Sequence, residues 1–170
     1  MDFEKYISVT LDFPTKGISF KDVSPLLADK DAFKAAIDEM SSYVKKHNAD
    51  VVIGPESRGF VFGAPVAYAS NVGFVMARKK GKLPGKVISK TYTLEYNTTT
   101  IELPFNSIKK GSKVFLVDDL LATGGTLKAV KELVEEQGGI VVGIITLIEL
   151  KDLNGKVNLG DVPYYSILKL

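Results

Sequence analysis

The sequence predicts an α/β fold in which a parallel sheet is flanked by helices, and three observations support this class. Apolar strand-like runs alternate with helical patterns along most of the chain. The strand candidates are apolar on both faces, as strands of a covered parallel sheet are. The length of 170 residues, with 45% hydrophobic content, suits one hydrophobic core and leaves little room for a second. We therefore predict a single domain over residues 1–170.

The chain begins with an irregular segment, residues 1–30, in which proline and glycine separate short apolar pieces. A helix follows, with Asp31 as its expected N-cap. Its apolar positions recur at helical spacing through about residue 46: Phe33, Ile37, Met40 and Val44.

Residues 49–54 predict a short buried strand, which ends at a glycine. Residues 60–69 are apolar enough for a buried helix, and residues 73–77 predict a second strand. Between residues 80 and 110, glycine and proline flank the β-rich run 87–94. This pattern predicts a mobile hairpin or flap.

The last third of the chain predicts a third strand at residues 113–117 and a helix at 126–137. A Gly-Gly pair ends this helix, and a continuous apolar strand follows at residues 140–147. In parallel sheets, ligands bind outside the carboxyl ends of the strands. We therefore expect the site in three loops, at residues 54–59, 77–84 and 118–126.

The composition excludes several kinds of chemistry. The chain has no cysteine, so disulfides, thiolate metal sites and a thiol nucleophile are excluded. The one histidine, His47, lies in a basic cluster and is expected to be solvated, which argues against a Ser-His-Asp triad. The longest apolar stretch is about half a membrane span, and no signal peptide is visible, so we expect a cytoplasmic protein without a membrane partner.

The charges are distributed unevenly, although the formal net charge is only +2. Between Glu56 and Glu95 there is no acidic residue. The same interval contains seven basic residues, which are Arg58, Arg78, Lys79, Lys80, Lys82, Lys86 and Lys90. Such a block suggests an anionic ligand, although a solvated surface would give the same pattern. Few aromatic residues interrupt the basic run, so a small phosphorylated ligand is favoured over nucleic acid.

The strongest chemical signal is the segment 114–126, where an apolar strand leads into two acids, a turn of small residues and a helix. Glycines let backbone N–H groups approach a phosphate, and the N-terminus of the helix adds its positive end. Thr123 and Thr126 can donate hydroxyl hydrogen bonds to the same phosphate, while Asp118 and Asp119 suit vicinal ribose hydroxyls or a magnesium-bound sugar. The plain alternative is a strand followed by a capped helix. Neither common nucleotide-binding glycine motif is present.

The segment Val114–Thr126 resembles the phosphoribosyl pyrophosphate binding motif of the type I phosphoribosyltransferases. The run Asp-Asp-Leu-Leu-Ala-Thr-Gly-Gly-Thr is similar to that of the adenine-specific members. Four further segments match the family in order, and together they extend over nearly the whole chain: residues 13–22, 54–60, 78–84 and 94–96.

The resemblance implies a magnesium-dependent reaction in which adenine and phosphoribosyl pyrophosphate give AMP and pyrophosphate. It implies that Asp118 and Asp119 hold the ribose hydroxyls. The 5′-phosphate would be held by Ala122, Thr123, Gly124, Gly125 and Thr126. Pyrophosphate would be bound by Glu56, Ser57, Arg58, Arg78 and Lys82, with a cis peptide often found at the position of Glu56–Ser57. Magnesium would be bound mainly through the substrate.

The resemblance also assigns the base and the proton chemistry. Residues 1–30 become a hood over adenine, with Ser19, Phe20, Lys21 and Leu150 around the base. Residues 83–104 become a flap that excludes water. Glu95 in this flap is the candidate general acid or base at the purine ring. Two departures are Asn97, where glycine is common, and Lys21, where many relatives have arginine.

Two alternatives remain open at this stage. One is a phosphoribosyltransferase for hypoxanthine, guanine or xanthine. The other is a non-catalytic regulator that only senses phosphoribosyl pyrophosphate; such proteins usually carry a DNA-binding segment, for which this chain has no room. Relatives are dimers, so a homodimer is expected.

Overall fold

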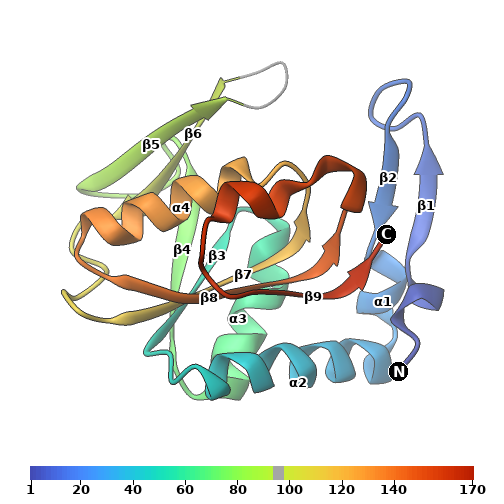
Figure 1. Ribbon diagram of the computed structural model, residues 1–170, viewed down its shortest axis with the longest axis horizontal. Coiled ribbons are helices and arrows are strands. Elements are labelled where there is room, and N and C mark those ends of the chain that lie inside the picture. Colours follow the sequence, from blue (N-terminus) through green and yellow to red (C-terminus); the bar gives the residue numbers. More distant parts are fainter. Residues whose placement is uncertain (94–97) are drawn as a thin grey trace.

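The computed structural model describes residues 1–93 and 98–170 and contains a seven-stranded sheet (Figure 1). The strand order is β5-β6-β4-β3-β7-β8-β9. The bounds of these strands are β3 Val51–Pro55, β4 Gly73–Lys79, β5 Val87–Thr93, β6 Thr98–Pro104, β7 Lys113–Leu121, β8 Ile140–Glu149 and β9 Tyr164–Lys169. Strands β4, β3, β7, β8 and β9 pair in parallel, while β5 and β6 form an antiparallel extension at one edge.

Helices cover both faces of the sheet, as the apolar strands predict. The helices are α1 Ser24–Ala28, α2 Lys30–Lys46, α3 Arg58–Ser70 and α4 Gly125–Glu136. In β7, Phe115 and Val117 pack in the core on the side of α2 and α3, whereas Val114 and Leu116 pack in the core on the side of α4. This alternation divides the interior into two layers, and the predicted fold class is confirmed.

The predicted elements of the core are all present, with two instructive differences in their bounds. The N-cap of α2 is Asp29 rather than Asp31, because the Asp29 carboxylate accepts the backbone N–H groups of Asp31 and Ala32. Strand β7 continues past residue 117 to Leu121, because it remains paired with β8 as far as Glu149. The two acids therefore lie within the strand instead of after it.

The opening segment is more regular than expected. It contains a short 3₁₀ helix, Phe3–Tyr6, and an antiparallel hairpin made of β1 (Ser8–Leu11) and β2 (Ser19–Asp22). Figure 1 shows this hairpin standing at one side of the core, near the C-terminus. The prediction of an irregular segment is wrong here because the two strands are short and one of them is exposed along its whole length, so neither shows the alternation of a buried face.

The expectation that His47 is solvated is also wrong. Its side chain is partly buried, and its ring packs edge-on against Phe115 and Tyr165. Nδ1 lies 2.8 Å from the Tyr43 carbonyl oxygen. The basic neighbours hid this role because they project outward from the end of α2 while His47 turns inward. Within residues 1–93 and 98–170, no helix has the length and apolar character of a membrane span.

Candidate functional site

The loops after β3, β4 and β7 meet at the carboxyl ends of these strands, as the sequence predicts. Glu56 connects the first two loops: its Oε2 accepts the Lys79 backbone N–H at 2.9 Å and lies 3.3 Å from Arg78 Nε. Arg78 in turn donates to the Lys82 carbonyl oxygen at 3.1 Å. Burial alone would raise the pKa of Glu56, but these hydrogen bonds and the cationic neighbours outweigh it and hold that pKa below its ordinary value. Glu56 is therefore an anionic anchor for cationic residues.

The peptide bond between Glu56 and Ser57 is cis, as the resemblance implies. Arg58 follows as the first residue of α3 and reaches across to β7. Its Nε lies 2.7 Å from Oδ2 of Asp119. The approach is not aligned as a hydrogen bond, so Arg58 balances the buried Asp119 Oδ2 by charge.

Asp118 and Asp119 form the acidic centre of the site. Asp119 is only 5% exposed, and its backbone N–H donates to Asp118 Oδ1 at 2.9 Å. Burial, reinforced by the neighbouring Asp119 charge, raises the pKa of Asp118 well above its ordinary value. Burial also raises the pKa of Asp119, against the opposing effect of Arg58. Hydrogen bonds from hydroxyl groups, or a bound cation, would stabilise the charged form of this pair.

Residues 122–126, here called the phosphate loop, connect β7 to α4. Gly124 has φ of +82° and directly precedes the first residue of α4. A Cβ at Gly124 would lie 2.5 Å from the Gly155 carbonyl oxygen, and a Cβ at Gly155 would lie 2.0 Å from the Ala122 carbonyl oxygen. Asn158 donates from Nδ2 to the Thr123 carbonyl oxygen at 2.6 Å. The segment 155–158 therefore fits closely against the loop and fixes its shape.

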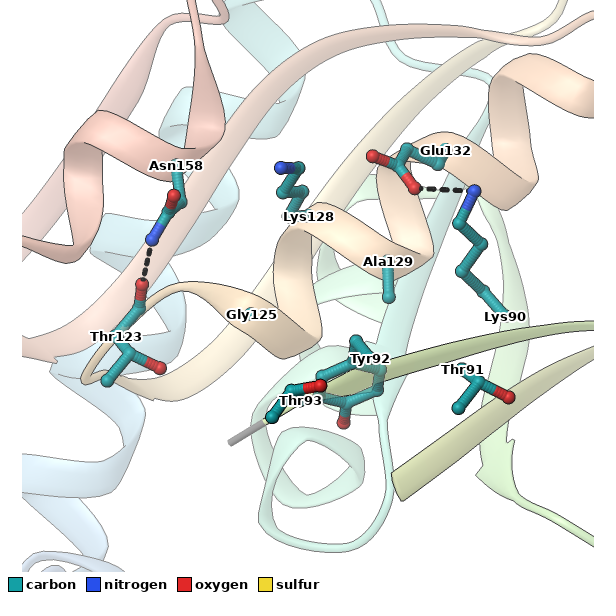
Figure 2. A pocket seen from close by; sticks show the side chains of 10 residues that line it. All are labelled: Lys90, Thr91, Tyr92, Thr93, Thr123, Gly125, Lys128, Ala129, Glu132 and Asn158. Carbon is teal, nitrogen blue, oxygen red and sulfur yellow. Dashed lines mark hydrogen bonds and ion pairs between the residues drawn. The ribbon is translucent and has the colours of Figure 1, made fainter. Parts of the chain in front are cut away.

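A cavity of about 550 Å³ lies beside the phosphate loop, between α4 and β5 (Figure 2). Lys90 and Glu132 form an ion pair of 2.8 Å across it, and Lys128 is exposed at its rim. Tyr92 belongs to the same wall, and its hydroxyl lies 2.9 Å from Thr126 Oγ1. The hairpin of β5 and β6, here called the edge hairpin, thus makes direct contact with the start of α4.

The residues expected around the base lie on two separate elements. Ser19, Phe20 and Lys21 are on β2, where Lys21 Nζ donates to Ser19 Oγ at 3.2 Å. The guanidinium carbon of Arg58 lies 5.0 Å from the centre of the Phe20 ring, a cation–π contact that joins the hairpin to the acidic centre. Leu150 follows β8 and donates its backbone N–H to the Leu121 carbonyl oxygen at 2.9 Å. Glu95, the candidate general acid or base, lies outside the described residues.

A family model described as the phosphoribosyl transferase domain matches residues 26–166. The chain belongs to this family. An adenine phosphoribosyltransferase of Clostridium botulinum is 52% identical over 167 residues, which is 98% of this chain and 97% of that protein. The crystal structure of adenine phosphoribosyltransferase from Thermoanaerobacter pseudethanolicus superposes with a TM-score of 0.96 at 44% identity, covering 99% of this chain and 98% of that one. The Saccharomyces cerevisiae enzyme, solved with adenine and an imino-altritol bisphosphate, gives a TM-score of 0.93 at 36% identity, covering 98% of this chain and 97% of that one.

Sequence reasoning missed three residues that contact the candidate site: Tyr92, Gly155 and Asn158. Gly155 and Asn158 lie in the sequence Asn-Gly-Lys-Val-Asn-Leu-Gly, which carries no motif and reads as an ordinary loop. Tyr92 reads as one more β-forming residue of the edge hairpin. Each is close to the phosphate loop only through tertiary contacts, so no local pattern could have identified it.

Proposed function

We propose that this protein transfers the phosphoribosyl group of phosphoribosyl pyrophosphate to adenine, giving AMP and pyrophosphate in purine salvage. The observation that carries the proposal is the combination at the end of β7: two adjacent acids, of which Asp119 is buried and Asp118 partly buried, followed by a tightly held loop at a helix N-terminus. This arrangement suits a sugar that carries a phosphate. The choice of adenine is supported by the names of relatives that match over nearly their full length.

In this proposal, Ala122, Thr123, Gly124, Gly125 and Thr126 hold the 5′-phosphate. The start of α4 presents backbone N–H groups and a positive dipole end to it. Asp118 and Asp119 accept hydrogen bonds from the ribose hydroxyls.

Pyrophosphate is proposed to bind at Ser57, Arg58, Arg78 and Lys82, with Glu56 holding Arg78 in place. Arg58 forms an ion pair with Asp119. Its guanidinium group would also interact with the pyrophosphate. Among the described residues, no cluster of three acidic or histidine side chains could hold a metal alone. We therefore propose that Mg²⁺ binds chiefly through substrate oxygens, with the acidic pair nearby, where it would neutralise charge on the leaving pyrophosphate.

The base is proposed to lie between Phe20 and Leu150, with Ser19 and Lys21 beside it. Glu95 is proposed to exchange a proton with the purine ring, and residues 83–104 are proposed to shield the activated sugar from water. The hood (residues 1–30), the core (residues 31–170) and this flap would serve one activity in a single domain.

We further propose a homodimer of cytoplasmic location, without nucleic acid as a partner. Val61, Tyr68 and Met76 on α3 and β4 are exposed apolar or aromatic side chains, and Tyr68 is 89% exposed. A second copy of the chain is the proposed cover for them. Sedimentation analysis of the wild type and of Tyr68→Glu would test this. In a two-fold symmetric interface the substitution places a negative charge on both copies, and their repulsion should weaken the dimer.

The test of the proposed function is formation of AMP from adenine, phosphoribosyl pyrophosphate and Mg²⁺, with hypoxanthine, guanine and xanthine as parallel substrates. We expect turnover with adenine to exceed that with each other base by orders of magnitude. Higher turnover with another purine would reassign the base. Tight binding of phosphoribosyl pyrophosphate without turnover of any base would favour the sensing regulator.

A further inference from the structure

We infer that Tyr92 is a positioning residue for the 5′-phosphate, acting through the hydroxyl of Thr126. This inference rests on the proposed function, because it assumes that Thr126 binds the 5′-phosphate. It adds a residue of the edge hairpin to the phosphate site.

Tyr92 is held against the start of α4 by two contacts. Its hydroxyl lies 2.9 Å from Thr126 Oγ1. Its ring covers Gly125 so closely that a Cβ there would lie 3.3 Å from Tyr92 Cδ2. Figure 2 shows the ring beside this first turn of the helix. The tyrosine is therefore fixed by packing as well as by its hydrogen bond.

The direction of the hydrogen bond follows from the chemistry of the ligand. A phosphate oxygen accepts hydrogen bonds, so Thr126 must use its single hydroxyl proton to donate to it. Thr126 Oγ1 can then take part with Tyr92 only as an acceptor, and Tyr92 must donate. Burial raises the pKa of Tyr92, which keeps its proton in place at neutral pH. The result is a directed chain from Tyr92 through Thr126 to the phosphate, in which each hydrogen bond strengthens the next.

The effect should be confined to ligands that carry a 5′-phosphate. The proposed pyrophosphate residues lie at the carboxyl ends of β3 and β4, whereas Tyr92 contacts the start of α4. Glu56 follows β3, Arg58 begins α3 and Arg78 is near the end of β4. A general disturbance of the edge hairpin would weaken the binding of both the 5′-phosphate ligand and pyrophosphate. Loss of the directed chain would weaken only the phosphomonoester.

The test compares Tyr92→Phe with a matched variant of the same strand, Thr91→Val. Phenylalanine keeps the ring over Gly125 and removes only the hydroxyl. Thr91→Val removes a hydroxyl contact of 2.9 Å to Thr100 within the hairpin, on the opposite face of β5. Calorimetric titration would measure the Kd of ribose 5-phosphate and the Kd of pyrophosphate with Mg²⁺ for each protein.

We expect Tyr92→Phe to raise the Kd of ribose 5-phosphate by about 3- to 10-fold, which is the worth of one neutral hydrogen bond, with the Kd of pyrophosphate unchanged. Thr91→Val should change neither. In a Thr126→Val background, Tyr92→Phe should have no further effect, because the chain is already broken. An unchanged Kd in Tyr92→Phe, or an equal loss for both ligands, would overturn the inference. Failure of the wild type to bind ribose 5-phosphate would instead overturn the proposed function, and this inference with it.

Discussion

The phosphate loop and the β1–β2 hairpin lie on two sides of the same site, and they are built in opposite ways. The loop follows the buried strand β7 and is locked by Gly155 and Asn158. The hairpin is a two-stranded sheet of its own, and it leaves Leu11 73% exposed and Phe13 52% exposed. Its contact with the acidic centre is the Phe20–Arg58 approach at 5.0 Å.

This difference indicates how the two substrates are received. A loop whose shape is set by the fold binds a phosphate without an ordering cost. A two-stranded hairpin is marginal on its own, and covering its exposed apolar side chains would stabilise it. Under the proposed function, the sugar phosphate would therefore bind to a preformed site, whereas the hairpin would become ordered around the base only when the base binds.

The largest effect is expected at the acidic pair. Asp118→Asn combined with Asp119→Asn should lower kcat/KM by about 10²–10⁴, because each hydrogen bond that a ribose hydroxyl donates to a charged carboxylate is worth about 1.5–3 kcal/mol. Steady-state kinetics with adenine and phosphoribosyl pyrophosphate would measure it. Activity near that of the wild type would contradict the assignment of the ribose site.

The variant Asp118→Asn also tests the raised pKa of Asp118 through the pH dependence of stability. The pKa of Asp118 is raised in the fold, so its protonated form contributes stability that is present below its ordinary pKa of 3.8 and lost as pH rises through the higher folded value. Asparagine lacks this dependence. Denaturant unfolding should show the variant gaining stability relative to the wild type as pH increases from acid to neutral.

The next effect concerns Glu95, which is proposed to act on the base rather than to bind it. Glu95→Gln keeps the shape and removes the proton chemistry, so kcat should fall by about 10²–10⁴ while both KM values change little. Arg58→Ala should in contrast raise the KM for phosphoribosyl pyrophosphate as well. A glutamine variant with only a raised KM would make Glu95 a binding residue.

Gly155→Ala should disturb the phosphate loop, although Gly155 itself is not proposed to contact the substrate. The new Cβ would lie 2.0 Å from the Ala122 carbonyl oxygen, so the phosphate loop must shift. Because a misplacement of about 1 Å can cost about 10²-fold, we expect kcat/KM for phosphoribosyl pyrophosphate to fall by up to that amount. Gly73→Ala is the matched control, since its Cβ would meet Val51 at an ordinary 3.6 Å. Equal kinetics in the two variants would argue against the idea that Gly155 fixes the shape of the phosphate loop.

The smallest effect is expected on the base side. Phe20→Ala should raise the KM for adenine by roughly 5- to 50-fold, the worth of one stacking contact. The KM for phosphoribosyl pyrophosphate should change much less, through the lost contact with Arg58. Phe20→Leu separates stacking from simple apolar contact, because leucine restores only the latter. If both variants bind adenine normally, Phe20 is not a base contact.

The sequence predicted the half of the site that is local. The strand–turn–helix pattern of residues 114–126 is contiguous, so composition and spacing alone placed the acids and the threonines together. It could not show that β7 extends through Leu121, because pairing with β8 decides where the strand ends. It could not find Tyr92, Gly155 or Asn158 either, since packing in three dimensions brings them to the loop.

Crystal structures of the free protein and of its complex with AMP would test the account most directly, because AMP carries both the base and the 5′-phosphate. After superposition on the sheet, we expect the Cα atoms of residues 118–126 to agree within about 1 Å, as preformed sites do. The β1–β2 hairpin should move further and bring Phe20 onto the base. A phosphate loop that rearranges while the hairpin stays in place would contradict the account.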